Sequence, residues 1–112
     1  MTMSKQKTEL LRQVQSLASC IAKEIGPRRI ILFGSHARGQ AGPDSDVDLL
    51  VVTDRPAGND ASLNLRRKIE YSFPLDLIVC DKKRLARRIK AGDFFLQDAV
   101  KGGKVLYEKA DC

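Results

Sequence analysis

The chain contains no tryptophan, a single histidine and only three cysteines. The cysteines are Cys20, Cys80 and Cys112, which lie far apart in the sequence and form no Cys-x-x-Cys pair. A zinc site or a disulfide framework is therefore not expected, because both need several cysteine or histidine side chains at suitable spacing. The sequence instead predicts reduced thiols, as is usual in the cytoplasm.

Long apolar runs are also missing. No stretch approaches the roughly 20 apolar residues that are needed to span a bilayer. The N-terminal residues, MTMSKQKTEL, lack the apolar core of a secretory signal. We therefore expect a cytoplasmic protein with no membrane-spanning segment.

The size and charge of the chain narrow the possible functions further. A length of 112 residues with 43% apolar content predicts one domain, residues 1–112, around a single core. The net charge of +6 favours polyanionic ligands such as nucleotides, nucleic acid or an acidic protein. The alternative is that most of the lysines and arginines only solvate the surface. An enzyme of this size is expected to act on another macromolecule, or on an acceptor held by a partner subunit.

The pattern of apolar residues predicts helices that alternate with short strands. Apolar residues at steps of three and four predict a first helix from Ser4, its cap, to Ile25. Branched apolar runs predict strands at residues 29–33, 47–53, 75–80 and 104–107. Further helices are predicted at residues 34–39, 61–72 and 82–90 and from residue 93 onward, with Asp60 and Asp81 as caps of the helices that follow them. The fold class is therefore α/β (α+β), with a small sheet of three or four strands and helices packed on it.

A candidate phosphate site lies in the segment GSHARGQAGPDSDVDLLV, residues 34–51. Gly34 follows a strand and allows the backbone to approach a ligand closely. The N–H groups at the start of the predicted helix have no partner within it, so they and the helix dipole favour an anion. The Ser35 hydroxyl adds one donor, and Arg38, about one turn further on, is a candidate for another phosphate contact. A strand–Gly–Ser–helix junction alone is weak support for such a site.

Asp46 and Asp48 form a candidate metal site within the same segment. Two residues apart on a strand, they point to one face at a separation of about 6.5 to 7 Å along the chain. Carboxylates placed in this way can bind one or two hard cations such as Mg²⁺, together with phosphate oxygens and water. The alternative is a capping or surface pair, but the apolar residues that follow, LLVV, indicate a strand that emerges from the core.

Asp76 is the third candidate acid, because it interrupts the apolar run LDLIV. A charge inside a strand is costly unless it is paired, metal-bound or at an exposed end of the strand. If a neighbouring strand brings Asp76 beside the other two acids, it can bind metal and help to remove a proton from an acceptor hydroxyl. If instead it lies at an exposed edge, it has no such role.

Together these residues resemble the signature of the polymerase-β-type nucleotidyltransferase superfamily. Gly34-Ser35, the spacing to Asp46-x-Asp48 and a later strand aspartate match that signature, and the form GSHARG…SDVDLLV is most similar to the minimal nucleotidyltransferases (MNT). The resemblance covers nearly the whole chain. It implies the polymerase-β-like fold, a small mixed sheet flanked by helices. It gives no catalytic role to His36, which falls at a variable position of the motif.

The resemblance also implies a reaction and a partner. The reaction is Mg²⁺-dependent transfer of AMP from ATP to a hydroxyl, served by two metal ions. Gly34, Ser35 and Arg38 would hold the nucleotide, and Asp46, Asp48 and Asp76 would be catalytic and bind metal. Minimal members are commonly paired with a HEPN ribonuclease toxin, and they act as antitoxin by adenylylating a tyrosine of that toxin. The alternative from a different class is a non-catalytic antitoxin that neutralises its partner by occlusion alone.

The basic segment KKRLARRIK, from Lys82 to Lys90, has more than one interpretation. It can bind nucleic acid or an acidic partner, or it can be a solvated helix with Leu85 and Ile89 facing inward. The segment contains no aromatic residue, which disfavours single-strand binding by base stacking. A second apolar row on the first helix, together with the adjacent Phe94 and Phe95, also makes an oligomer or partner contact possible.

Overall fold

In the computed structural model of the protein, residues 5–42 and 45–110 are described. The predicted cap Ser4 lies outside these residues. The elements run in the order α1 (Lys5–Ile25), β1 (Arg29–Phe33), β2 (Val47–Thr53), α2 (Ala61–Lys68), β3 (Leu75–Asp81), α3 (Lys82–Lys90), α4 (Phe94–Gly102) and β4 (Lys104–Glu108). The predicted α/β class and the four strands are confirmed, and β1 and β2 have the predicted bounds.

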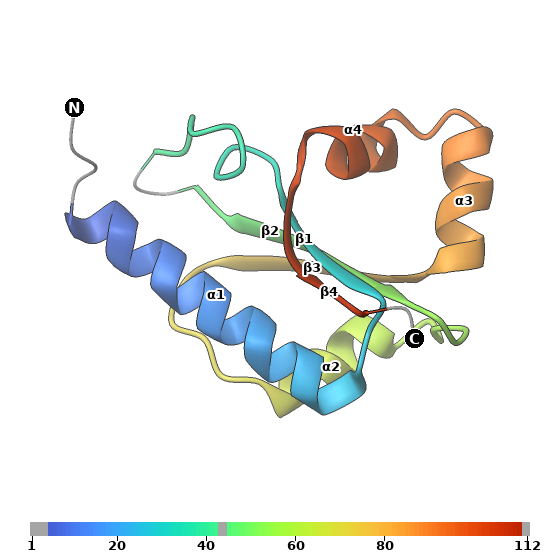
Figure 1. Cartoon of the computed structure of the whole chain (residues 1–112), viewed down its shortest axis with the longest axis horizontal. Helices are drawn as coiled ribbons and strands as arrows, with labels where there is room; N and C mark the ends of the chain where they lie inside the picture. The colour runs from blue at the N-terminus through green and yellow to red at the C-terminus, as the bar shows by residue number, and fades with distance from the viewer. Residues whose placement is uncertain (1–4, 43–44, 111–112) are drawn as a thin grey trace.

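The four strands form one mixed sheet in the order β3-β2-β1-β4 (Figure 1). β2 and β3 are parallel and are joined by a crossover through α2, whereas β1 is antiparallel to both β2 and β4. The central position of β1 and β2 explains their continuous apolar sequences, because a strand covered on both faces has little exposure to water. β3 and β4 form the two edges.

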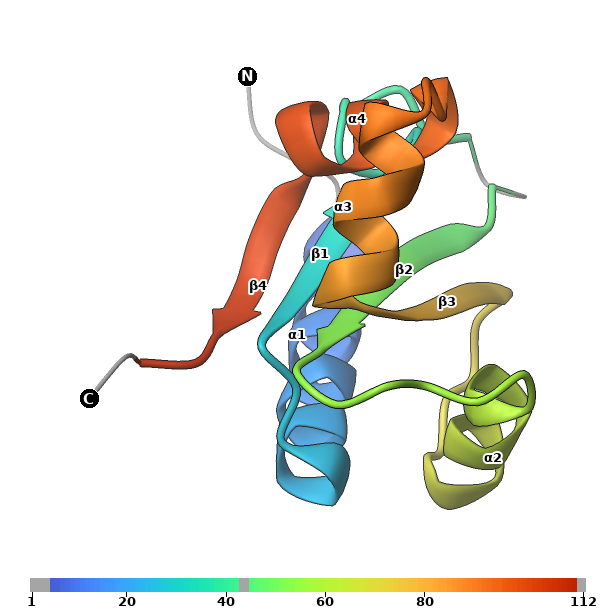
Figure 2. The ribbon, with the colours of Figure 1, turned by 90° about the vertical axis from the view of Figure 1, so that its right-hand side faces the viewer.

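Helices cover both faces of the sheet, which gives three layers (Figures 1 and 2). Along β2, Leu49 and Val51 face α1 and α2, where they pack with Leu17 and Ile21 of α1. Leu50 and Val52 point to the opposite face, which α3 and α4 cover through Leu85, Leu96 and Ala99. Side chains alternate between the faces of a strand. The even-numbered residues of β2 and β3, which include Asp48 and Asp76, therefore share the α3–α4 face.

Two predicted helices differ in the structure: one is replaced by a turn and the other is shorter. Residues 34–39 form a turn and not a helix, because Gly39 adopts a φ of 71° and closes the segment after one turn. The N–H of Gln40 donates to the Ser35 carbonyl at 2.9 Å and that of Gly39 to the His36 carbonyl at 3.4 Å, as at a helix C-terminus. Helix α2 ends at Lys68 and not at residue 72, since extended backbone at Ile69 returns the chain to the sheet.

Of the predicted helix caps, Asp81 makes a capping hydrogen bond and Asp60 does not. The side chain of Asp81 accepts a hydrogen bond from the Arg84 N–H, which confirms it as the cap of α3. Asp93 caps α4 in the same way through the Leu96 N–H. Asp60 occupies the cap position of α2 but makes no capping hydrogen bond with its side chain. Across the described ranges 5–42 and 45–110, no helix combines the length and the apolar character needed to cross a membrane.

Candidate active site

The turn after β1 leaves several backbone donors free. The Arg38 N–H donates to the Gly34 carbonyl at 3.2 Å, so residues 34–38 follow one helical turn. Within the described part of the chain, the N–H groups of residues 35–37 have no hydrogen-bond acceptor. Unpaired N–H groups at the start of a helical turn favour an anion, although the turn is too short for a full helix dipole. The predicted phosphate-binding role of Gly34 and Ser35 therefore has a local structural basis.

Gly34 lies directly against Asp48. Its φ of 75° is in the left-handed region that favours glycine. A β-carbon at residue 34 would collide with the Oδ2 atom of Asp48 and lie 3.2 Å from its Cγ. Only glycine therefore lets the phosphate-type turn and the strand carboxylate lie side by side.

Asp48 and Asp76 are neighbours across the parallel pair β2–β3. They are direct register partners, and Phe33, at the end of β1, is the register partner of Asp48 on its other side. The side chain of Asp48 is half-buried, whereas Asp76 lies at the exposed start of β3. The sheet register thus brings together two of the three predicted acids, although α2 and its connecting loops lie between them in the sequence.

The pKa of Asp48 is raised above its ordinary value, first by burial and then by the charges of Asp76 and Asp46. His36 and Arg38 act in the opposite direction. All three predicted acids are therefore close enough to interact electrostatically. A carboxylate that is partly desolvated and repelled by two others gains stability from a bound cation.

Asp46 lies in the segment before β2 and is exposed. The preceding residue, Ser45, is tied to the phosphate-type turn, since the His36 Nε2 lies 3.1 Å from the Ser45 carbonyl oxygen. Because a carbonyl can only accept, this nitrogen of His36 must donate. No role is predicted for His36 from the sequence, and its position inside the motif is the one signal there that it contacts the acidic segment.

Arg38 connects the turn to α4. Its Nη1 lies 3.4 Å from the Oδ2 of Asp98, and its Nε donates to the Gln40 side chain at 3.4 Å. The ion pair is exposed and long, so it contributes little stability. Arg38 can therefore exchange Asp98 for a phosphate oxygen at low cost. No local sequence pattern indicates Asp98, which is 60 residues from Arg38.

The donor set fits a hard cation that is shared with a nucleotide. Among residues 5–42 and 45–110, no three histidine, cysteine or acidic side chains form a ready-made metal cage. Mg²⁺ does not need such a cage, because it commonly binds through one or two carboxylates plus substrate phosphates and water. Asp48 and Asp76, beside the free N–H groups of the turn, provide this arrangement.

A cavity of about 680 Å³ lies at the other end of β2 and β3. Thr53, Asp54, Asn59 and Lys68 are among the residues that line it, and none of the three predicted acids does so. We place the candidate active site at the acids, because the converging charges and the free backbone donors are there. Asp46 and Asp76 are exposed, so a large acceptor can reach the acids from solvent.

Comparison with known proteins identifies the family of the chain. Residues 9–101 match the model of the nucleotidyltransferase domain family. The chain belongs to this family. A relative from Methanocaldococcus jannaschii, provisionally named a protein adenylyltransferase, is 31% identical over 80 residues, which cover 71% of this chain and 78% of the relative. The predicted nucleotidyltransferase family is thus confirmed.

Solved structures support the nucleotidyltransferase fold. A provisionally named nucleotidyltransferase from Sulfolobus solfataricus superposes with a TM-score of 0.66 at 21% identity, covering 97% of this chain and 93% of that one. A chain from a toxin–antitoxin structure with AMP-PNP superposes with a TM-score of 0.60 at 23% identity, covering 85% of this chain and 73% of that one. At these identities the likeness concerns the fold. The predicted polymerase-β-like architecture is confirmed.

Proposed function

We propose that this nucleotidyltransferase moves AMP from ATP to a hydroxyl of a protein in the presence of Mg²⁺. The observation that carries the proposal is the contact between Gly34 and Asp48, with Asp76 as the register partner of Asp48. Backbone N–H groups and two carboxylates that lie close together support this reaction. The M. jannaschii relative named as a protein adenylyltransferase, and the structural neighbour solved with AMP-PNP, support the choice of reaction and nucleotide.

Each residue has a definite task in this proposal. The N–H groups that follow Gly34, the Ser35 hydroxyl and the Arg38 guanidinium hold the triphosphate. Asp46, Asp48 and Asp76 would hold two Mg²⁺ ions, which supply positive charge to offset the negative charge that develops on the phosphate oxygens. The acceptor oxygen forms a bond to the α-phosphorus, and the bond from that phosphorus to the bridging oxygen breaks, which releases pyrophosphate. Asp76, which is more exposed than Asp48, would receive the proton of the hydroxyl.

We propose further that the acceptor is a tyrosine of a HEPN ribonuclease toxin, so that the protein acts as an antitoxin in the cytoplasm. Because Asp46 and Asp76 are exposed and none of the acids lines the 680 Å³ cavity, the site suits a macromolecular acceptor better than a small one. The toxin–antitoxin neighbour supports a toxin partner. Two thiols that remain free, Cys20 and Cys80, are compatible with a reducing compartment.

The proposal is tested by incubating the protein with a candidate HEPN partner, Mg²⁺ and α-³²P-ATP, followed by mass spectrometry of the partner. We expect one or more AMP groups on a tyrosine, and loss of labelling in Asp48→Asn with the fold retained. Labelling that survives this substitution would reject the metal-binding role of Asp48. Neutralisation of the partner by the Asp46→Ala, Asp48→Ala double variant at equal abundance would instead favour occlusion without catalysis.

A further inference from the structure

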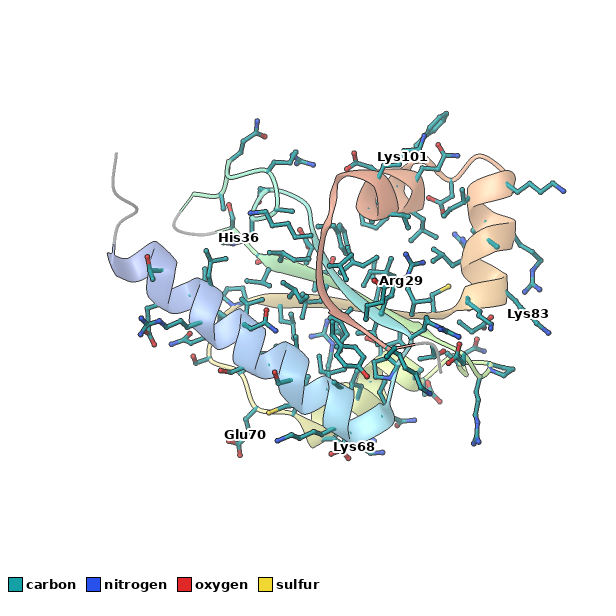
Figure 3. All side chains as sticks on the ribbon, viewed as in Figure 1. Arg29, His36, Lys68, Glu70, Lys83 and Lys101 are labelled. Carbon is teal, nitrogen blue, oxygen red and sulfur yellow. The ribbon has the colours of Figure 1, made fainter. Side chains whose placement is uncertain are left out.

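The outer side of α3 carries a row of cations that form no ion pair with the described residues. Lys83, Arg84, Arg87 and Lys90 are all exposed. The ion pairs of α3 with described residues use its other two cations, Lys82 with Asp54 at 3.5 Å and Arg88 with Asp93 at 3.2 Å. Figure 2 shows α3 in front of the sheet with no other element over its outer side, and Lys83 projects outward in Figure 3. Four positive charges therefore face solvent along a helix of nine residues.

Two exposed aromatic side chains follow this row of cations closely in the sequence. Phe94, at the start of α4, is 81% exposed, and Phe95 is 54% exposed. Such exposure is unusual for phenylalanine, whose burial usually contributes about 1.5–3 kcal/mol. α3 packs against α4, so the cations of the one and the rings of the other belong to one surface. We call Lys83, Arg84, Arg87, Lys90 and Phe94 the α3–α4 surface.

The α3–α4 surface is connected to the candidate active site. The ring of Phe95 packs edge-on against that of Phe33, with ring centroids 5.3 Å apart. Phe33 is in turn the register partner of Asp48. On the other side of the turn, α4 contacts Arg38 through Asp98. The Phe94 end of this surface is therefore linked to Asp48 through Phe95 and Phe33, whereas Lys83 follows the opposite end of β3 from Asp76. An occupant that reaches both the cations and the acids must be as large as a protein.

We propose that the α3–α4 surface docks an acidic region of the acceptor protein and presents the acceptor hydroxyl to Asp48 and Asp76. This inference rests on the function proposed above and adds the chemistry by which the acceptor is recognised. Four exposed cations on one side of a helix favour a negatively charged occupant. Arginine and exposed aromatic residues are enriched at protein interfaces, where an aromatic ring commonly serves as an apolar anchor.

A protein fits this surface better than a nucleic acid does. Nonspecific binding of single strands uses several aromatic rings on which successive bases stack. Here Phe94 is the more exposed of the two rings near the cations, and Phe95 packs against Phe33. A phosphate backbone that continued from the cations toward the active site would also meet Asp98, Asp48 and Asp76. A protein can place its acids opposite α3 and a neutral hydroxyl-bearing side chain at the site.

The test measures the KM for the acceptor in the labelling reaction and, without ATP, the Kd of the complex by titration calorimetry. The variants are the Lys83→Glu, Arg87→Glu double substitution and Phe94→Ser, with circular dichroism to verify the fold. We expect the double substitution to raise both KM and Kd about tenfold or more at low salt, with a smaller difference at high salt. The KM for ATP should stay at the wild-type value. Phe94→Ser should raise both constants at every salt concentration.

The matched control is the Lys23→Glu, Lys68→Glu double substitution on α1 and α2, which makes the same change of charge on the opposite face. It should leave the KM and Kd for the acceptor unchanged. Equal effects of the two double substitutions, or no effect of either, would overturn the docking surface. The docking surface would also be overturned if Lys83→Glu, Arg87→Glu weakened binding of RNA but left the Kd for the acceptor unchanged.

The two proposals fail in different ways. If the wild-type protein binds the acceptor but transfers no label, the proposed function is wrong, and the calorimetric comparison still decides the docking surface. If label is transferred with the same KM by wild type and by the Lys83→Glu, Arg87→Glu variant, the function stands and the docking surface is wrong.

Discussion

The Oδ2 atom of Asp48 occupies the space that a β-carbon at residue 34 would need. This relationship joins the end of β1 to the start of β2, which are adjacent antiparallel strands. It explains why a glycine and an aspartate that lie far apart in the motif belong to one site. The phosphate-type turn cannot keep its position beside β2 if residue 34 carries a side chain.

We predict that Gly34→Ala abolishes labelling of the acceptor and lowers the free energy of unfolding. The new methyl group collides with Asp48, and alanine is strained at the φ of 75° that glycine adopts here. The strain alone costs about 1–2 kcal/mol. Labelling with α-³²P-ATP and urea unfolding measure the two effects.

Gly39→Ala is the control that separates collision from strain. Gly39 has a similar φ of 71°, but a β-carbon there would have nothing within 4 Å. We expect a comparable loss of stability with much of the activity retained. If Gly39→Ala abolishes labelling as completely as Gly34→Ala does, backbone strain and not the contact with Asp48 controls the site.

Asp48→Asn should make the metal-free protein more stable than the wild type, although it abolishes labelling. Burial and the charges of Asp76 and Asp46 raise the pKa of Asp48 above 3.8. Ionisation of Asp48 therefore lowers the stability of the folded state. This loss of stability is absent below pH 3.8 and reaches its full size once the pH is above the raised pKa of the folded protein. Because asparagine carries no charge, the variant should melt at a higher temperature than the wild type in EDTA at neutral pH.

With Mg²⁺ and ATP present, the wild type should melt at a higher temperature than Asp48→Asn. Ligands that bind only the folded state raise its stability, and the variant has lost part of the proposed metal site. Glu70→Gln, which removes an exposed acid between α2 and β3 that is outside the proposed ligand set, should respond to Mg²⁺ and ATP like the wild type. An Asp48→Asn protein that gains as much thermal stability as the wild type would show that metal binds elsewhere.

The sequence predicted the parts of the site better than their arrangement. The strands were visible because β1 and β2 are continuous apolar runs, and Asp81 was recognised as a cap because capping depends on residues a few positions away. The pairing of Asp48 with Asp76 depends on the parallel register across the α2 crossover, which no local pattern encodes. The contact of Arg38 with Asp98 is equally distant in sequence. The helix predicted at residues 34–39 failed because a glycine at positive φ closes it after one turn.

His36 should act as a positioning residue for Asp46. Its Nε2 donates to the Ser45 carbonyl and fixes the segment that carries Asp46 against the turn. We predict that His36→Ala lowers the labelling rate up to about tenfold, the equivalent of a hydrogen bond of roughly 0.5–1.5 kcal/mol. The loss should shrink at high Mg²⁺ concentration, because excess metal compensates for a displaced ligand.

His36→Gln tests whether the hydrogen bond is the cause. Glutamine retains an N–H donor of similar reach, so it should recover a large part of the rate that alanine loses. Equal rates for the alanine and glutamine variants would show that the imidazole ring, and not the bond to Ser45, is required. Wild-type rates for both would remove His36 from the site.

The cap of α4 provides a prediction about pH that is independent of the acids of the site. Hydrogen bonds from the Leu96 N–H and from Arg88 lower the pKa of Asp93 below 3.8. Its charge therefore stabilises the fold above pH 3.8, and this contribution disappears as the pH falls through the lower folded pKa. Asp93→Asn keeps an oxygen acceptor but no charge, so the variant should be less stable than the wild type at neutral pH.

Urea unfolding over a range of pH measures this difference. The gap between wild type and Asp93→Asn should be widest near neutrality and should close at the acidic end of the titration. Asp60→Asn is the matched control, since Asp60 occupies the cap position of α2 without a capping hydrogen bond from its side chain. It should leave the free energy of unfolding close to that of the wild type. A gap for Asp93→Asn that does not change with pH would mean that the geometry of the cap, and not its charge, stabilises the start of α4 beside Phe94 and Phe95.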